Sequence, residues 1–290
     1  MTLPTTPLIR TEPREFEFAD RDFRRVCELI HQRAGIALAP AKRDMVYGRL
    51  SRRLRALGLR SFQAYLDLLE RDGGEEWQAF TNALTTNLTS FFREPHHFDK
   101  LREELQRRAA QVVSTQPLLL WSCAASTGEE PYSMAITACE AFGTLKPPVR
   151  IVATDVDTQV LATASRGVYA IDRVSGMEPD LRRRYFQRGT GPNEGQCRVN
   201  PALRELIDFR PLNLLASRYD VGGPFTALFC RNVMIYFDKP TQRDILGRLV
   251  QHLADDGLLY TGHSENYLHA SDLIQPCGRT LYRRVAGAGA

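Results

Sequence analysis

Residues 124–133 read AASTGEEPYS, between the apolar run PLLLW at 117–121 and MAITACEAF at 134–142. An apolar run, a turn of small residues and a helical stretch predict strand, turn and helix, the frame that commonly holds nucleotide-type ligands. Two acids, Glu129 and Glu130, stand where a phosphate site would have bare backbone N–H groups or a lysine. They favour a cationic ligand. The alternative is that they only offset the helix dipole.

Further apolar, β-prone runs alternate with helical stretches. They are PLLLWSCA (117–124), VRIVATDVD (149–157), IDFRPLNLL (207–215), FTALFCRNV (225–233) and GLLYTGHSE (257–265). This alternation predicts a mainly parallel sheet with helices on both faces, and RTLYRRV (279–285) is expected to return as an antiparallel strand. Ligands of such sheets bind at the carboxyl ends of the strands, so functional residues should follow these runs.

The residues at these strand ends indicate the chemical identity of the ligand. Asp155 closes the second run, and an acid there typically accepts hydrogen bonds from ribose hydroxyls. A ribose together with a positive charge and no phosphate describes S-adenosylmethionine. Asn213 and Leu214 follow the third run and suit an adenine edge and face, while Arg231, Asn232 and Tyr236 follow the fourth.

The N-terminal part of the sequence has a helical pattern throughout, with no β-prone runs. Helical periodicity at 20–35, 41–58 and 61–74 predicts a small all-helical domain over 20–75, with Gly35 and Gly58 as stops and Ser61 as a cap. Met45, Leu50, Leu54 and Leu57 are expected to face inward from the second helix. Its basic residues Lys42, Arg49 and Arg53 can share one stripe, which favours an acidic partner over a merely solvated face.

The remaining boundaries follow from composition. We expect a disordered leader at 1–19, a helical connector at 76–115, the α/β domain at 116–284 and an unstructured tail at 285–290. Within the α/β domain, residues from about 175 to 202 interrupt the alternation. Their two short β-prone pieces around RGTGPNEG (188–195) predict an inserted antiparallel hairpin or small sheet.

The composition is that of an ordinary soluble protein. The chain has 290 residues, 43% hydrophobic and 25% charged, with a formal net charge of +4. Neither a membrane span nor a signal peptide is expected, which places the protein in the cytoplasm. The six cysteines are scattered and form no C-x-x-C pair, so they suggest neither a disulfide framework nor a zinc cluster.

Six strings together resemble the chemotaxis receptor methyltransferases, the CheR family. They are TTNLTSFFRE (85–94), AASTGEEPYS (124–133), ATDVD (153–157), RGTGPNEG (188–195), FCRNVMIYFDK (229–239) and GHSEN (262–266). The resemblance runs in order from about residue 20 to 284. It implies a Rossmann-like class I methyltransferase sheet with an all-α N-terminal domain and a small inserted antiparallel β-subdomain. It also implies methyl transfer from S-adenosylmethionine to glutamate side chains of chemoreceptors.

The resemblance further implies roles for individual residues. Asn87, Thr89, Arg93, Asn213, Leu214, Arg231 and Asn232 would line the cofactor pocket. Glu130, with Glu129 as a second candidate, would bind the methionine amino group, and Asp155 the ribose. Arg93 and Tyr236 would lie beside the transferred methyl group. The basic helix would contact the receptor. A C-terminal receptor peptide could add a strand to the β-subdomain, with Arg188, Gly189, Gly191, Gly195 and Arg198 as candidates.

This chemistry needs neither a general base nor a metal. A glutamate with an ordinary pKa of about 4.3 is ionised at neutral pH. His96 and His97, adjacent in the connector, are therefore expected to cap or pack. The product would be S-adenosylhomocysteine, and a monomer is expected.

Three alternatives remain open. The first is a methyltransferase acting on nucleic acid or a small molecule, with the basic helix binding phosphates. The second is a non-catalytic signalling protein that retains the cofactor pocket as a sensor, against which the presence of both Arg93 and Tyr236 counts. A dinucleotide oxidoreductase ranks last because the phosphate-binding turn is absent.

Overall fold

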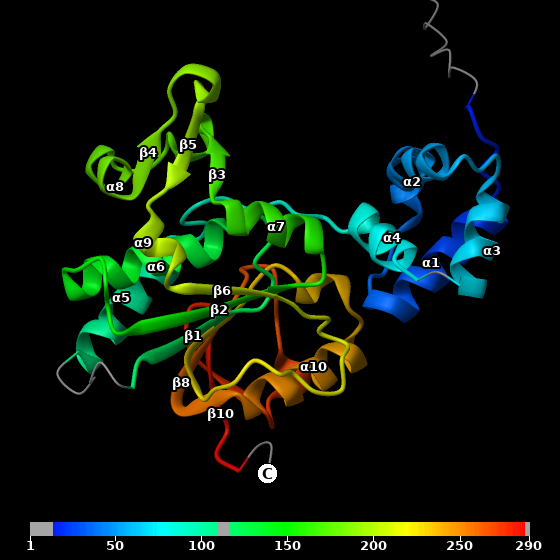
Figure 1. The fold of residues 1–290 in the computed structure, drawn as a ribbon. Coiled ribbons are helices and arrows are strands. Elements are labelled where there is room, and N and C mark those ends of the chain that lie inside the picture. The colour runs from blue at the N-terminus through cyan, green and yellow to red at the C-terminus, as the bar shows by residue number, and fades with distance from the viewer. Residues whose placement is uncertain (1–13, 73, 110–115, 288–290) are drawn as a thin grey trace, which may run out of the picture.

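A computed structural model describes residues 14–72, 74–109 and 116–287 (Figure 1). Most of the predicted leader, the end of the predicted connector at 110–115 and the last three residues of the tail lie outside these residues. Four N-terminal helices form one group, and the rest of the chain is built on a seven-stranded sheet with a separate three-stranded sheet. Among the described residues, no helix is long and apolar enough to cross a membrane.

The N-terminal group has a single helical core. Its elements are α1 (Asp20–Ala34), η1 (Pro40–Lys42), α2 (Arg43–Leu57), α3 (Phe62–Asp72) and α4 (Glu76–Leu84). As predicted, α1 ends at Gly35, which adopts a left-handed conformation with φ 69°. The Ser61 hydroxyl caps α3 by accepting a hydrogen bond from Ala64 N at 3.2 Å. One prediction was wrong: Leu57 is 39% exposed, whereas Val46 is fully buried.

The predicted helical connector is interrupted. Its first helix, α4, contributes Phe80 and Leu84 to the N-terminal core, and α5 (His96–Arg108) starts a separate helix. Residues 85–95 between them are not helical. Pro95 disfavours helical geometry at the residue before it, and Glu94 has a φ of 58°. Because the chain is not helical here, residues of this segment can line a pocket at the carboxyl ends of the strands.

The large sheet confirms the predicted parallel architecture. Its order is β6-β2-β1-β7-β8-β10-β9. The bounds are β1 (Leu118–Ser122), β2 (Val149–Asp155), β6 (Ile207–Pro211), β7 (Phe225–Cys230), β8 (Leu253–Thr261), β9 (Ile274–Gly278) and β10 (Leu281–Arg284). Neighbours from β6 to β8 pair in parallel, and β10 pairs antiparallel with β8 and β9. Strand β9 was not predicted, because its Pro276 and Gly278 are unfavourable in all but edge strands.

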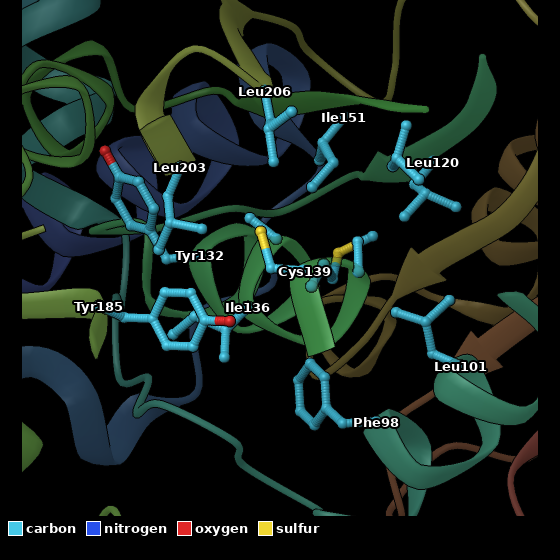
Figure 2. Close-up of a cluster of buried hydrophobic side chains, with 14 of the residues drawn as sticks. Phe98, Leu101, Leu120, Tyr132, Ile136, Cys139, Ile151, Tyr185, Leu203 and Leu206 are labelled. Atoms are coloured by element: carbon cyan, nitrogen blue, oxygen red, sulfur yellow. The ribbon is translucent and has the colours of Figure 1, made fainter. Parts of the chain in front are cut away.

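Helices cover both faces of this sheet. They include α5, α6 (Glu129–Phe142), α7 (Thr158–Arg166) and α10 (Lys239–Gln251). Neighbouring residues Leu120 and Trp121 of β1 belong to different core clusters because side chains alternate along a strand. Figure 2 shows the cluster around Leu120, where Phe98 and Leu101 of α5 and Ile136 of α6 pack against the sheet.

The small sheet consists of β3 (Val168–Ala170), β5 (Gln196–Val199) and β4 (Phe186–Arg188), in that order and antiparallel throughout. The small sheet contains the hairpin predicted within residues 175–202, formed by β4 and β5. Its third strand, β3, lies before the predicted insertion. The short elements around it and elsewhere are η2 (Ile171–Val174), α8 (Pro179–Tyr185), η3 (Gly191–Asn193), α9 (Pro201–Arg204), η4 (Met234–Tyr236) and η5 (Leu268–Ala270). In Figure 1 this sheet projects at the upper left, away from the N-terminal helices.

Candidate active site

One pocket lies at the carboxyl ends of the strands, where the fold predicts a ligand. Its empty volume is about 1270 Å³, including the open mouth. The segments after β1, β2, β6 and β7 form one wall, and residues of 34–45 and 84–93 form the other. The backbone of Ala37 joins the two walls by donating to the carbonyl of Tyr236 at 3.1 Å. The N-terminal helical group therefore forms part of the wall of the pocket.

Most of the predicted site residues meet in this pocket. Those that line it are Asn87, Thr89, Arg93, Glu130, Asp155, Asn213, Leu214, Arg231, Asn232, Tyr236 and, from the N-terminal group, Lys42. Sequence positions up to about 190 residues apart are thus brought to one cavity, as strand-end positions of a parallel sheet should be.

The turn after β1 depends on Gly128, which has a φ of 99°. A Cβ there would come within 2.8 Å of the Ala164 side chain and the Tyr169 hydroxyl, so only glycine fits. Helix α6 begins at the next residue, Glu129. The turn thereby places the first turn of α6 beside the tips of β1 and β2.

Glu130 is the buried acid of the pocket. Its carboxylate accepts hydrogen bonds from Ser122 Oγ at 2.7 Å and from Arg231 Nη1 at 2.9 Å. Burial raises the pKa of Glu130, and the neighbouring Arg231 opposes this shift. The direct contact with the guanidinium favours the carboxylate form. Glu130 therefore offers negative charge to a cationic group in the pocket.

Glu129 does not share this position, so its prediction as a pocket residue was wrong. Its side chain is buried elsewhere, accepting from Thr127 Oγ1 at 2.6 Å and pairing with Arg173. Consecutive residues of a helix point about 100° apart, so only one of the two glutamates can face the cavity. Arg173 also donates to the Thr89 carbonyl at 2.9 Å, which links η2 to the pocket wall.

Asp155, at the tip of β2, is fixed by the neighbouring backbone. Its carboxylate accepts from Ser126 N at 2.8 Å and from Asp157 N at 2.9 Å. Burial raises the pKa of Asp155 to about 6, against the lowering effect of these backbone donors. At neutral pH it is an ionised acceptor with a defined orientation, which suits a pair of ribose hydroxyls.

Asn213 lines the pocket, but its amide is already engaged. Its Nδ2 donates to the carbonyl of Arg33 at 2.7 Å, and its Oδ1 accepts from Leu215 N at 2.9 Å. The side chain therefore joins the sheet to the end of α1, and what it offers a ligand is chiefly its backbone. Leu214 beside it is buried and supplies an apolar wall.

The non-helical segment 85–95 brings Asn87, Thr89 and Arg93 to the pocket. Asn87 Nδ2 donates to Asp157 Oδ2 at 2.9 Å, and Arg93 Nη1 donates to the Leu88 carbonyl at 2.9 Å. Arg93 and Tyr236 approach the same cavity from different segments. This pairing of a guanidinium and a phenol is suited to orienting an incoming carboxylate.

Two acids that hold the pocket together were missed in the sequence. Asp157 accepts from Thr85 Oγ1 at 2.7 Å as well as from Asn87, and it caps α7 through Gln159 N at 2.9 Å. An acid directly before a helix could have been identified as a cap. Glu265 accepts from Val233 N at 3.1 Å and Met234 N at 3.0 Å, and no local pattern indicates that.

The basic stripe of α2 is not an open surface. Arg49 Nη1 donates to the carbonyls of Ala83 at 3.1 Å and Thr85 at 2.6 Å, at the end of α4. Arg53 forms a two-point ion pair with Glu76 at 2.9 and 2.6 Å. Arg49 and Arg53 thus hold α2 against α4, and the receptor contact of this stripe stays a prediction. Lys42 alone of the three lines the pocket.

The candidate residues for binding a receptor peptide lie in the hairpin, and its glycines are needed for the conformation of the hairpin turn. A Cβ at Gly189 would collide with the backbone oxygen of Asn193, and Gly191 and Gly195 have φ values of 57° and 82°. These glycines therefore shape the turn. Arg188 lies opposite the buried Cys197, whereas Arg198 lies opposite the exposed Gln187, so the two arginines lie on different faces of the small sheet.

His96 and His97 begin α5, and His97 is fully buried. His97 Nε2 lies 2.6 Å from Thr280 Oγ1, which accords with the packing role expected for it. Together with Glu94 the two histidines have the spacing of a metal-ligand group. Arg231, whose Nη2 lies 3.6 Å from Glu94 Oε2, disfavours a second cation there.

Comparisons with known proteins agree with this architecture. The family model described as "CheR methyltransferase, SAM binding domain" matches residues 87–283, and "CheR methyltransferase, all-alpha domain" matches residues 21–85. A relative from Pseudomonas aeruginosa, "Chemotaxis protein methyltransferase 2", is 53% identical over 268 residues, 92% of this chain and 94% of the relative. "Chemotaxis protein methyltransferase" from Escherichia coli is 51% identical over 278 residues, 96% of this chain and 95% of the relative.

Proposed function

The chain belongs to the CheR methyltransferase family, and we propose that it transfers the methyl group of S-adenosylmethionine to glutamate side chains of chemoreceptors. The coarser part of this function, an S-adenosylmethionine-dependent methyltransferase of chemotaxis, follows from the family itself. The observation that carries the finer part is the pocket in which Arg93 and Tyr236 stand beside the buried acids Glu130 and Asp155.

Each end of the donor has a matching group in this pocket. We assign the methionine ammonium to Glu130 and the ribose hydroxyls to Asp155. The adenine would lie against Leu214 and the backbone of Asn213. Asn87, Thr89, Arg231 and Asn232 would complete the binding site, all of them lining the same cavity. This arrangement supports a ligand with positive charge and a ribose.

The transfer itself needs little more than positioning. The donor supplies a methyl group made electrophilic by its sulfonium. The glutamate oxygen forms the new bond to carbon, the carbon–sulfur bond breaks with its electron pair going to sulfur, and no proton moves. Because both charges disappear in this step, a pocket that excludes water favours it. Alignment in such reactions is worth up to about 7 to 11 kcal/mol in the best intramolecular cases.

Arg93 is the residue assigned to hold the incoming carboxylate. Its guanidinium donates one hydrogen bond to its own segment, at Leu88, and lies at the cavity rather than in an ion pair among the described residues. Tyr236 would orient the carboxylate or the methyl group from the opposite segment. Lys42, at the N-terminal wall, would attract the acidic substrate towards the mouth of the pocket.

We also assign a receptor-binding role to the small sheet. Among the residues that the structure describes, β4 pairs only with β5, so its other edge can accept an added strand. Arg188, exposed at the end of β4, is placed to meet an acidic residue or the terminal carboxylate of a receptor peptide.

A C-terminal receptor peptide is therefore expected to bind the free edge of β4. Isothermal titration calorimetry should detect binding, and Arg188→Ala should weaken it about fivefold, the effect of one exposed charged contact. Arg183→Ala is the matched control, because Arg183 is an exposed arginine of α8 that pairs with Asp180. Absence of binding heat, with no competition by the peptide against receptor methylation, would rule this assignment out.

The nature of the product tests the proposed function. Incubation with methyl-labelled S-adenosylmethionine and receptor-containing membranes should label the receptor, and mild alkali should release that label as methanol. Methyl groups on nitrogen would survive alkali and would indicate nucleic acid or another substrate. Absence of transfer to receptors under conditions where the donor binds would favour the non-catalytic alternative.

A further inference from the structure

The short helix η4 ends at Tyr236, and buried polar side chains hold it from two sides. On the first side, Glu265 Oε1 accepts from Val233 N at 3.1 Å and from Met234 N at 3.0 Å. Glu265 is buried and lies in the segment after β8. Tyr236 N itself donates to the Val233 carbonyl at 3.1 Å. The carboxylate of Glu265 therefore fixes the backbone turn that carries Tyr236.

Gln242 of α10 holds the second side of η4. Its Nε2 donates to the carbonyls of Met234 at 2.9 Å and Phe237 at 3.0 Å. Gln242 is also buried, and its Oε1 accepts from Lys239 Nζ at 3.2 Å, which fixes the orientation of the amide. A carboxylate that binds N–H groups and an amide that binds carbonyls thus hold the same turn in place.

The backbone before η4 needs such support. Asn232 has a φ of 58°, which residues other than glycine adopt rarely, so tertiary contacts have to stabilise it. The segment after β8 approaches it so closely that a Cβ at Gly262 would lie 2.4 Å from Asn232 Nδ2. Gly262 N also donates to Glu265 Oε2 at 2.5 Å. Both oxygens of Glu265 are therefore used to join the segment after β8 to the segment that leads to Tyr236.

We infer that Glu265 and Gln242 are positioning residues that fix the Tyr236 hydroxyl for methyl transfer. This role rests on the proposed function, in which Tyr236 orients the substrate carboxylate or the methyl group. Neither Glu265 nor Gln242 is among the described residues that line the pocket, so their contribution is to the geometry of η4. A third contact, from Ala37 N to the Tyr236 carbonyl at 3.1 Å, holds the same turn against the N-terminal group.

Gln242→Met keeps the length of the side chain and removes both hydrogen bonds to η4. It should lower kcat for receptor methylation about tenfold, because small displacements of a positioning group cost rate steeply. The Kd for S-adenosylmethionine, measured by calorimetry on the full chain, should change by less than about threefold. Glu104→Gln is the matched control, because Glu104 is a buried polar residue of α5 that pairs with Lys100 and Arg107. An equal loss of kcat in both variants, or no loss in Gln242→Met, would overturn the inference.

A double-mutant cycle with Tyr236→Phe tests whether the loss of rate passes through the hydroxyl. Tyr236→Phe alone should lower kcat. Adding Gln242→Met should then lower kcat by less than about twofold further, because no hydroxyl remains to be misplaced. A further loss of about tenfold would indicate a general structural defect and would contradict the positioning role. Retained kcat in Tyr236→Phe would remove the role given to Tyr236, and with it this inference, but not the glutamate substrate.

Glu265 is tested in the same way from the other side of η4. Glu265→Met removes the acceptors of Val233 N and Met234 N and should lower kcat about tenfold or more, again only when Tyr236 is present. Glu265→Gln keeps one acceptor oxygen and should recover part of the rate. Thermal denaturation shows whether each variant is folded. If Glu265→Met is not, Glu265→Gln takes its place in the cycle, and additive losses there would argue against the role of Glu265.

Amide hydrogen exchange provides a measurement that needs no substrate. In Gln242→Met the N–H groups of residues 234–237 should exchange about fivefold faster than in the wild type, because η4 is then held from one side only. Those of residues 85–95 should not change. Unchanged exchange in η4 would overturn the inference whether or not receptors are methylated. Absence of receptor methylation by the wild type would instead contradict the proposed function, so the two failures are distinguishable.

Discussion

Replacement of Arg93 by alanine is expected to lower kcat for receptor methylation by about 100-fold or more, while the Kd for S-adenosylmethionine changes by less than about threefold. The reason is that Arg93 is placed to fix the incoming carboxylate, which is absent when only the donor is bound. Its side-chain contact to Leu88 stays within its own segment, so its loss leaves the acids of the pocket untouched.

Turnover at saturating donor and donor affinity by calorimetry should be measured on the same preparation. Arg93→Lys is the matched variant, because it keeps the charge but loses the two-point geometry of the guanidinium, and it should recover only part of the rate. The backbone carbonyl of Arg93 still accepts from Arg231 in both variants. Weakened donor binding with kcat retained would contradict this assignment.

Replacement of Asp155 by alanine is expected to have the opposite effects, with a large loss of donor affinity and a small change in kcat. It should raise the Kd for S-adenosylmethionine by about 100-fold or more, because hydrogen bonds from two ribose hydroxyls to a charged acceptor are lost at roughly 1.5 to 3 kcal/mol each. The kcat at saturating donor should change much less, since Asp155 is assigned to the ribose and not to the reacting atoms. Calorimetry and steady-state kinetics measure the two quantities.

Asp155→Asn is the control for lost packing. It keeps the size of the side chain, but its amide would face one of the backbone donors, Ser126 N or Asp157 N, that the carboxylate now accepts from. Thermal denaturation will show whether either variant has lost its fold. Donor affinity close to wild type in a folded Asp155→Ala variant would contradict the assignment of Asp155 to the ribose.

The raised pKa of Asp155, about 6, also predicts a pH dependence. Donor affinity should be constant above about pH 7 and fall as the pH drops through 6, because the protonated acid loses its acceptor charge. For folding, the native state binds this proton more tightly than the unfolded state does, so this group's contribution to stability decreases as the pH rises from about 4 to 6. The step in affinity should disappear in Asp155→Asn. A Kd that stays constant from pH 5 to 7.5 would contradict the assignment.

The sequence predicted those parts of the fold that local patterns encode. Runs such as those ending at Ser122, Asp155 and Cys230 are apolar, β-prone and separated by helical stretches, and they form the parallel strands. The strand-end rule and the family resemblance together identified the charged residues Arg93, Glu130, Asp155 and Arg231 of the pocket, but not its wall from residues 34–45. Gly35 and Ser61 end and begin helices because glycine and serine have specific backbone and side-chain properties there.

What the sequence could not predict depends on contacts between distant segments. Glu94 contacts residues 138 and 169 positions away, and neither separation leaves a local pattern. The pairing of Arg49 with the end of α4 likewise appears only when two helices pack. The choice between Glu129 and Glu130 depended on the angle at which α6 enters the pocket, which the sequence of the turn does not specify.

A crystal structure with bound S-adenosylhomocysteine tests the account most directly. We expect the ribose hydroxyls at Asp155, the methionine ammonium at Glu130 and the sulfur directed towards the space between Arg93 and Tyr236. A product molecule bound outside this pocket, or bound in it with its sulfur turned away from Arg93 and Tyr236, would contradict the proposed site.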